Sequence, residues 1–263
     1  MKKSFRSLAL IALLSLSVSL HAQDAEKKLR PKAHKINGFY MCGGGGFTSF
    51  DPSATSSISS CLMNNGFAPM ATSAGCGNYT PLHIMARNVV ADLDIMWQVK
   101  RNTVYNSSRT TTSGVGTRIG LGYVVLQGEH FLVYPEAGLY FGSMDVHSHQ
   151  GVLPVLDVSA TNQCTALDFS IHIDRLSSVI ADKTGFMKGT IPFGKIFSSV
   201  VGLTVGYTFC PYSSYWNDNN IDIYTKTSNN VTFLTNVVGE NNSASLSMFY
   251  IKLSIGFGAS WRS

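Results

Sequence analysis

Charged residues are scarce in this chain of 263 residues. Asp, Glu, Lys and Arg together make up 13% of it, against roughly 25% in soluble globular domains. Beyond the N-terminal segment, no stretch reaches the about 18 consecutive apolar residues of a membrane-spanning helix. The formal net charge of +5 falls to +2 when the three basic residues of the first six are removed. A nucleic-acid-binding protein and a helical membrane protein are therefore not expected.

The N-terminus has the order of a secretory signal. Three basic residues precede an apolar run from Leu8 to about Leu20, which ends in Leu-His-Ala at residue 22. This order predicts a cleaved signal peptide over residues 1–22. A membrane anchor is the alternative, but the run is shorter than the roughly 20 residues of a spanning helix and is interrupted by serines. No cysteine stands at the predicted cleavage point, so we do not expect a lipoprotein.

Apolar and polar residues alternate along several stretches of the chain, which show no helical periodicity. From Phe249 to Trp261 every odd-numbered residue is apolar, and most even-numbered ones are small or polar. A period of two predicts a strand with one apolar face and one wet face. The same division recurs in residues 89–100, 115–126, 131–142 and 201–209.

The face opposite the apolar residues separates two all-β folds. A soluble β-sandwich also alternates, but its outer face is expected to be rich in Lys, Glu and Thr. Here that face is dominated by Gly and Ser with isolated charges. Small residues suit a narrow barrel lumen in which side chains from facing walls interdigitate. We therefore predict an antiparallel transmembrane β-barrel in preference to a sandwich.

Loop lengths predict the topology, because such barrels have short periplasmic turns and longer external loops. The tight turn at residues 127–130 is predicted to be periplasmic, and a further strand is expected over Gly77–Ala86. Eight strands result, or ten if residues 165–174 and 183–191 are separate strands. The segments 51–78, 101–114, 144–164 and 211–244 are predicted to be external loops.

The chain resembles the small outer-membrane β-barrel proteins of Gram-negative bacteria, the OmpA-like and porin-like group. The resemblance rests on the signal, TRIGLGYVVLQGEHFLVYPEAGLYFG, GLTVGYTF and the terminal FYIKLSIGFGASW. It implies location in the outer membrane, contact with outer-membrane lipid and assembly by the barrel-assembly machinery. It implies no activity. Residues 23–35 are then a flexible periplasmic leader and residues 36–263 a single barrel domain.

Five charged residues fall on the wet side of their predicted strands. Because buried charges need partners, we expect acids and bases on neighbouring strands to pair and fill the lumen. The alternative is a selectivity ring lining the water of a small pore. The five residues are Asp92, Asp94, Arg118, Glu136 and Lys252.

The odd number of cysteines leaves one thiol over. All five follow the signal, and export would deliver them to an oxidising compartment. We predict disulfides Cys61–Cys76 and Cys164–Cys210, with Cys42 unpaired. No CxxC or His-rich spacing indicates a metal, and no cofactor is expected.

The candidates for chemistry are few. His147 and His149 lie in a predicted external loop, and His172 shares a strand face with Asp174. A solvated or structural role is favoured for these histidines, so we expect no enzyme. The external loops carry aromatic residues of the kind that anchor contacts, and these residues also suit the membrane interface. The sequence thus predicts a structural or surface-interaction, adhesin-like protein with an unidentified surface ligand, with a small passive porin as the alternative. The aromatic candidates are Tyr212, Tyr215, Trp216 and Tyr224.

Overall fold

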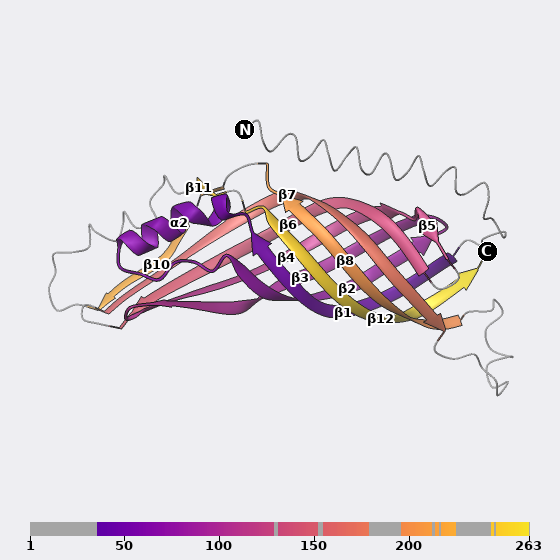
Figure 1. Ribbon diagram of the computed structural model, residues 1–263, viewed down its shortest axis with the longest axis horizontal. Coiled ribbons are helices and arrows are strands. Elements are labelled where there is room, and N and C mark those ends of the chain that lie inside the picture. Colours follow the sequence, from indigo (N-terminus) through magenta and orange to yellow (C-terminus); the bar gives the residue numbers. More distant parts are fainter. Residues whose placement is uncertain are drawn as a thin grey trace.

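The protein forms a long closed β-barrel (Figure 1). The computed structural model describes residues 36–128, 131–151, 155–178, 196–211, 214–215, 217–224, 243–244 and 246–262. Each barrel strand is antiparallel to its neighbours, and the last strand pairs with the first to close the sheet. The wall consists of β1 (Ile36–Phe50), β2 (Ser73–Ala86), β3 (Val89–Tyr105), β4 (Ser108–Tyr123), β6 (Phe131–Gln150), β7 (Val155–Ser178), β8 (Ile196–Phe209) and β12 (Met248–Arg262).

The barrel has eight strands rather than ten. β7 pairs directly with β8, so no strand intervenes between them. Residues 183–191, the alternative strand, lie outside the described residues, as do the predicted signal and leader. Short strands accompany the wall: β5 (Leu126–Gln127) pairs with the start of β6, β10 (Asn217–Tyr224) with the start of β7, and β9 (Ser214–Tyr215) with β11 (Ser243–Ala244).

The alternation predicted from the sequence is confirmed on the barrel wall. On β12 the odd-numbered residues face outward, and Phe257 is 66% exposed. The neighbouring even-numbered Tyr250 and Lys252 are buried inside. The outward sets of β3, β4, β6 and β8 are likewise exposed large apolar residues. Such a wall is stable only where lipid covers its outer surface.

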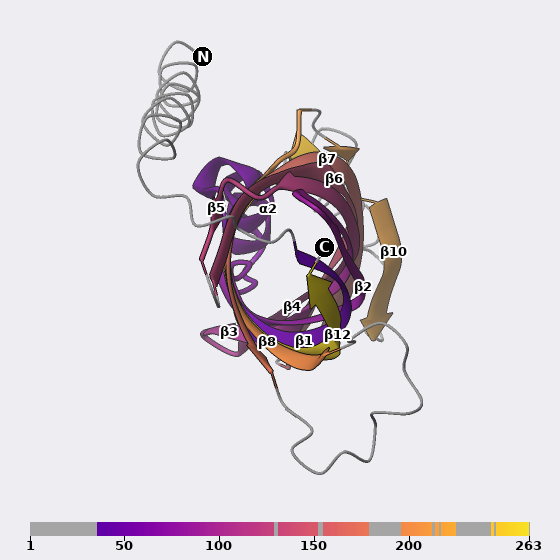
Figure 2. The same ribbon diagram turned by 90° about the vertical axis from the view of Figure 1, so that its right-hand side faces the viewer.

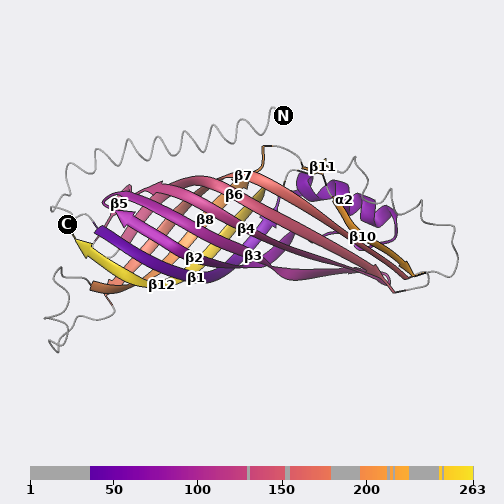
Figure 3. The same cartoon turned by 180° about the vertical axis from the view of Figure 1, so that it is seen from behind.

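The strands are longer than a membrane requires. β6 has 20 residues and β7 has 24, whereas about 9–11 residues cross a bilayer. The segments predicted as external loops, 101–114 and 144–164, are therefore corrected to strand hairpins where the structure describes them. We call residues 99–114, 144–151 and 155–164 the outer extension. It projects at the end opposite the C-terminus (Figures 1 and 3).

A helix replaces the first predicted loop. Helix α2 spans Pro52–Asn64, and proline at the first helical position after an aspartate is typical of a helix start. At its end, Gly66 has φ 82°, and the Phe67 amide donates to the Leu62 carbonyl at 2.9 Å. This is a Schellman termination, which glycine permits without steric cost. It turns Phe67 back onto the helix.

Three layers of side chains fill the interior of the barrel, whose strands are seen end-on in Figure 2. Along β3 the inward residues run from Val90 through Asp92 and Asp94 to Met96, and β2, β6 and β7 show the same order of apolar, polar and apolar residues. An outer apolar cluster contains Phe50, Ile58, Leu62, Phe67, Met70, Met96, Tyr140, Met144, Val146, Val158, Ala160, Ala166, Cys210, Leu246 and Met248. A periplasmic apolar cluster contains Ile36, Tyr40, Cys42, Met85, Val90, Val124, Leu132, Tyr134, Leu176 and Val200. The polar layer lies between them.

No helix in the described part of the chain is long and apolar enough to cross a membrane.

Candidate functional site in the barrel lumen

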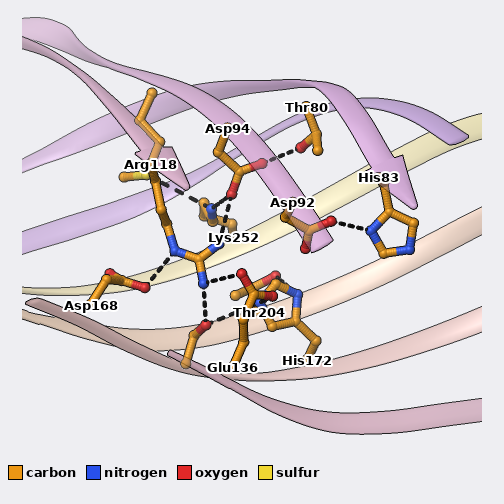
Figure 4. Close-up of polar contacts among 12 residues, drawn as sticks. Thr80, His83, Asp92, Asp94, Arg118, Glu136, Asp168, His172, Thr204 and Lys252 are labelled. Carbon is orange, nitrogen blue, oxygen red and sulfur yellow. Dashed lines mark hydrogen bonds and ion pairs between the residues drawn. The ribbon is translucent and has the colours of Figure 1, made fainter. Parts of the chain in front are cut away.

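Arg118 is the centre of the polar layer (Figure 4). Its side chain projects inward from β4 and is fully buried. Its Nε lies 2.5 Å from Asp168 Oδ1, its Nη1 3.2 Å from Asp94 Oδ2, and its Nη2 2.7 Å from Glu136 Oε1. Nη2 also donates to Ser170 Oγ at 2.7 Å. One guanidinium therefore links carboxylates from three other strands, which suits its planar set of donors.

Three further side chains contact the acids beside Arg118. Lys252 Nζ, from the last strand, lies 3.1 Å from Asp94 Oδ2, and the Thr80 hydroxyl donates to the same carboxylate. Tyr250 donates to Asp168 Oδ1 at 2.8 Å. Each of these carboxylates thus has a cation and a hydroxyl as partners, as buried acids require.

The histidines form a second group in the same layer. His172 Nε2 lies 3.1 Å from Glu136 Oε2, and its Nδ1 lies 3.2 Å from Thr204 Oγ1. His83 Nδ1 lies 2.5 Å from Asp92 Oδ1. All of these side chains except Thr204 belong to an ion pair, and all lie inside the barrel (Figure 4).

A tyrosine joins the two histidines to the remaining acid. Tyr134 donates to Asp174 Oδ2 at 2.8 Å and stacks on the His172 ring with 4.7 Å between centroids. His83 lies against the other side of this group, with its ring centroid 6.3 Å from that of Tyr134. Tyr134 therefore belongs to the polar layer through its hydroxyl and to the periplasmic apolar cluster through its ring.

The polar layer carries an excess of negative charge. Five buried carboxylates face two permanently charged bases and two imidazoles, so one carboxylate is in excess even when both imidazoles are protonated. Charge inside a low-dielectric interior is costly unless it is compensated. The acids are Asp92, Asp94, Glu136, Asp168 and Asp174, and the bases are Arg118, Lys252, His83 and His172.

Very little space remains in the lumen. A cavity of about 20 Å³ is lined by His83, Asp92, His172 and Asn78, among others. This is close to the volume that holds a single water. Asn78 Oδ1 and His83 Nε2 are buried and have no hydrogen-bond partner. This cavity has room for one small species.

The outer end of the lumen is covered by the chain that follows α2. Ser108, Thr110 and Thr112 form a row of inward hydroxyls on β4. The Ala68 amide donates to Ser108 Oγ at 2.5 Å, and Thr110 Oγ1 donates to the Ala68 carbonyl at 2.6 Å. The Ala71 amide donates to Thr112 Oγ1 at 3.3 Å. This row fixes the segment across the mouth of the barrel.

A groove opens beside this segment on the outer extension. Its volume is about 440 Å³, and Ser59, Pro69, Ala71, Arg101 and Thr103 are among the residues that line it. Among the described residues, β3 pairs with β2 only as far as Gln98, so one edge of residues 99–105 faces the groove region without a strand partner. Concave surfaces of this volume accommodate small ligands.

The sequence-predicted residues fall into several places. The five predicted lumen charges lie together in the polar layer, where Arg118 and Lys252 contact Asp94. Tyr212 and Trp216 lie outside the described residues. The backbones of Tyr215 and Tyr224 belong to β9 and β10.

The candidate catalytic histidines lie in two separate places. His149 Nδ1 lies 2.7 Å from Asp157 Oδ1 on the outer extension, and His147 Nε2 lies 3.8 Å from the same atom. His172 faces Glu136 in the lumen, and among the described side chains no hydrogen bond or ion pair joins it to Asp174, which accepts from Tyr134 instead.

Neither predicted disulfide is present. All five cysteines lie in the described part of the chain, and no disulfide joins any two of them. Cys61 packs against the outer apolar cluster, whereas Cys76 lies in the wall between Gly46 and Gln98. The side chains of Cys164 and Cys210 are within hydrogen-bonding contact.

The closed sheet decides the fold class. The chain is an eight-stranded β-barrel of the outer-membrane type. No protein-family model matches it, and no curated protein is a significant match.

Solved structures of outer-membrane proteins are similar to this barrel. Neisserial surface protein A is 10% identical over 84% of this chain and 97% of its own, with a TM-score of 0.41. Ail, the attachment invasion locus protein of Yersinia pestis, is 7% identical over 86% and 99%, with a TM-score of 0.38. The outer membrane protease OmpT from Escherichia coli is 8% identical over 89% and 99%, with a TM-score of 0.31. The assignment of the barrel rests on its own strand pairing.

Several residues of the polar layer were not predicted as members of it. Asp168, His172 and Asp174 alternate with apolar residues in the stretch 167–174, and this period places all three inside. The signal was therefore present in the sequence. His83 is different, because the pairing of β2 with β3 shifts register between Tyr79 and Leu82, and a bulge breaks the period.

Proposed function

We propose that the protein is a surface-interaction protein of the outer membrane of a Gram-negative bacterium, in which a closed barrel anchors the outer extension. The observation that carries this proposal is the filled lumen, with a polar layer between two apolar clusters and a remaining cavity of about 20 Å³. Such an interior favours an adhesin-like role over the alternative of a small passive porin. Export by the predicted signal peptide, residues 1–22, supports the location.

The proposal assigns no catalysis to the barrel. His172 is 6% exposed and enclosed by the ion-paired layer, where a macromolecular or lipid substrate has no access. The groove beside α2 is the better candidate for contact, because loops and extensions on a rigid scaffold commonly carry binding.

The residues of the groove indicate a polar, acidic ligand. Arg101 supplies a positive charge and Ser59 a hydroxyl, whereas the Thr103 hydroxyl already donates to the Pro69 carbonyl. Arginine with a neighbouring hydroxyl suits carboxylate or sulfate groups, which accept paired hydrogen bonds. We infer that acidic oligosaccharides are the ligand class.

A conductance measurement tests the closed lumen. The mature protein is refolded, its folding is verified by heat-modifiable gel mobility, and it is inserted into a planar bilayer beside a general porin that verifies the assay. We expect no steps from this barrel. Reproducible single-channel steps would instead establish the porin alternative.

A binding measurement tests the groove. Folded protein in lipid nanodiscs is applied to an array of sialylated, sulfated and neutral oligosaccharides. We expect binding to acidic members and a loss of tenfold or more in Arg101→Ala, because a hydrogen bond to a charged group contributes about 1.5–3 kcal/mol. Arg109→Ala is the matched control, since Arg109 is an exposed arginine of the adjacent strand. The assignment of the groove would be refuted if Arg101→Ala and Arg109→Ala bound equally well. It would also be refuted if the wild-type protein bound neither acidic nor neutral oligosaccharides.

A further inference from the structure

Three potential metal ligands meet in the polar layer. Asp92 on β3, Glu136 on β6 and His172 on β7 are all buried, and one ligand atom of each lies within 4.8 Å of the others. They come from three strands that are distant in the sequence, so the closed barrel alone brings them together. Two carboxylates and an imidazole within this distance form a compact ligand set.

A glycine makes room for this arrangement. Gly120 on β4 lies opposite Asp92, and a Cβ at this position would lie 1.6 Å from Glu136 Oε1. The carboxylate of Glu136 therefore occupies space that any other residue would fill. The close approach of Glu136 to Asp92 depends on the missing side chain.

Protein cations compensate this group of acids only in part, because the polar layer has one more carboxylate than it has basic groups. Arg118 contacts Oε1 of Glu136, whereas Oε2 of Glu136 lies next to His172. The two ion-paired oxygens of Glu136 are close to their partners, but neither is aligned for a hydrogen bond. Lys252 contacts Asp94 instead. A further positive charge beside Asp92 and Glu136 would balance the excess carboxylate of the layer.

A cavity and unpartnered polar atoms support the presence of a ligand independently. The cavity of about 20 Å³ is lined by Asp92 and His172 but not by Glu136, and its volume suits one ion or one water. His83 and Asn78 line the same cavity, and their Nε2 and Oδ1 atoms are buried without a partner. Buried polar atoms are nearly always satisfied, so these atoms point to a small polar occupant.

We propose that the lumen binds one divalent transition-metal ion through Asp92, Glu136 and His172. A mixed nitrogen and oxygen ligand set suits Zn²⁺ or Mn²⁺, whereas Ca²⁺ and Mg²⁺ prefer oxygen ligands alone. His83, held against Asp92 at 2.5 Å, orients this carboxylate from behind, as outer partners of metal ligands commonly do. The ion stabilises the closed barrel by neutralising the layer.

The test uses Mn²⁺ as the probe, because it binds thiols weakly and therefore reports little from the five cysteines. Full-length mature protein is refolded, freed of metal with a chelator and titrated with Mn²⁺, and free Mn²⁺ is followed by electron paramagnetic resonance. We expect one bound ion per barrel, and displacement by Zn²⁺.

Variants locate the site. His172→Gln and Asp92→Asn should each weaken Mn²⁺ binding by tenfold or more, and His149→Gln, a histidine beside an aspartate on the outer extension, should leave it unchanged. Folding of each variant is verified by gel mobility before titration. His83→Gln, which keeps the ligands, should weaken binding less than His172→Gln does.

Three results would overturn the inference. The first is that the wild-type barrel binds no Mn²⁺. The second is that the lumen variants bind Mn²⁺ as tightly as wild type, and the third is that His149→Gln alone abolishes binding. In the first case Asp92 and Glu136 share a proton instead of a metal. A metal-dependent rise in unfolding temperature that is present in wild type and absent in His172→Gln supports the site by a second readout.

Discussion

Replacing Arg118 by methionine should destabilise the barrel strongly. The guanidinium is fully buried and contacts Asp168 at 2.5 Å, Glu136 at 2.7 Å and Asp94 at 3.2 Å. Methionine fills similar volume but leaves buried carboxylates without their common cation. Removing one partner of a buried ion pair costs about 3–5 kcal/mol, which is a factor of roughly 10²–10⁴ in the unfolding equilibrium constant.

Urea unfolding of the refolded barrel in lipid vesicles measures this loss. Trp97 is 44% exposed on the outer wall, so its fluorescence reports insertion. Arg118→Lys should lose less than Arg118→Met, because it keeps a charge but not the planar donors. Arg109→Met, at an exposed position, is the control and should change stability by less than about 0.5 kcal/mol.

A double variant tests whether the contacts themselves cause the loss. Adding Asp168→Asn to Arg118→Met should restore part of the stability, since one unpaired carboxylate is then neutral, and coupling between contacting residues is about 0.5–3 kcal/mol. A loss below about 1 kcal/mol in Arg118→Met would refute the argument that this network holds the lumen together.

Two further substitutions probe the outer apolar cluster and the polar layer. Phe67→Ala should lower the free energy of unfolding by about 3–5 kcal/mol, because Phe67 is fully buried in the outer apolar cluster. Urea titration measures this loss. A loss of only tenths of a kcal/mol would show that the segment after α2 does not pack there in the membrane. Gly120→Val should lower the free energy of unfolding by about 1–3 kcal/mol, because its side chain pushes the Glu136 carboxylate away from Arg118. Gly128→Val is the control and should lower it less, since a Cβ at Gly128 has only ordinary contacts. Equal losses in the two variants would contradict this cause.

The lipid-facing wall was predictable because a single physical rule governs it. Lipid on one side and packed side chains on the other impose a period of two, and Phe249 to Trp261 follows it throughout. The position of Lys252 inside the barrel follows from the same period. Where this contrast between the two faces exists, the sequence specifies the strand and its orientation.

The outer extension lacks that contrast. Residues 99–105 and 108–114 contact the chain after α2 through the hydroxyls of Thr103, Ser108, Thr110 and Thr112, and their exposed residues include apolar Val104 as well as charged Arg109, so apolar and polar residues do not alternate regularly there. Helix α2 was missed for a related reason, since Ser and Thr dominate PSATSSISSCLMN and only Ile58, Cys61 and Leu62 mark its packed face. Tertiary packing determines both structures.

The polar layer joins residues that are distant along the chain. Tyr250 reaches Asp168 over 82 positions, and Lys252 reaches Asp94 over 158. Contacts at such separations form late and slow folding.

The order of synthesis therefore matters for insertion. Until β12 pairs with β1 and β8, Asp94 lacks Lys252, and Asp168 lacks Tyr250. A charged side chain exposed to lipid near the bilayer midplane costs about 2–4 kcal/mol if it is Arg or Lys, and less if it is Asp or Glu. Arrival of the last strand, closure of the wall and neutralisation of the interior are thus a single event, and a chain that lacks β12 keeps charges that oppose its entry into the membrane.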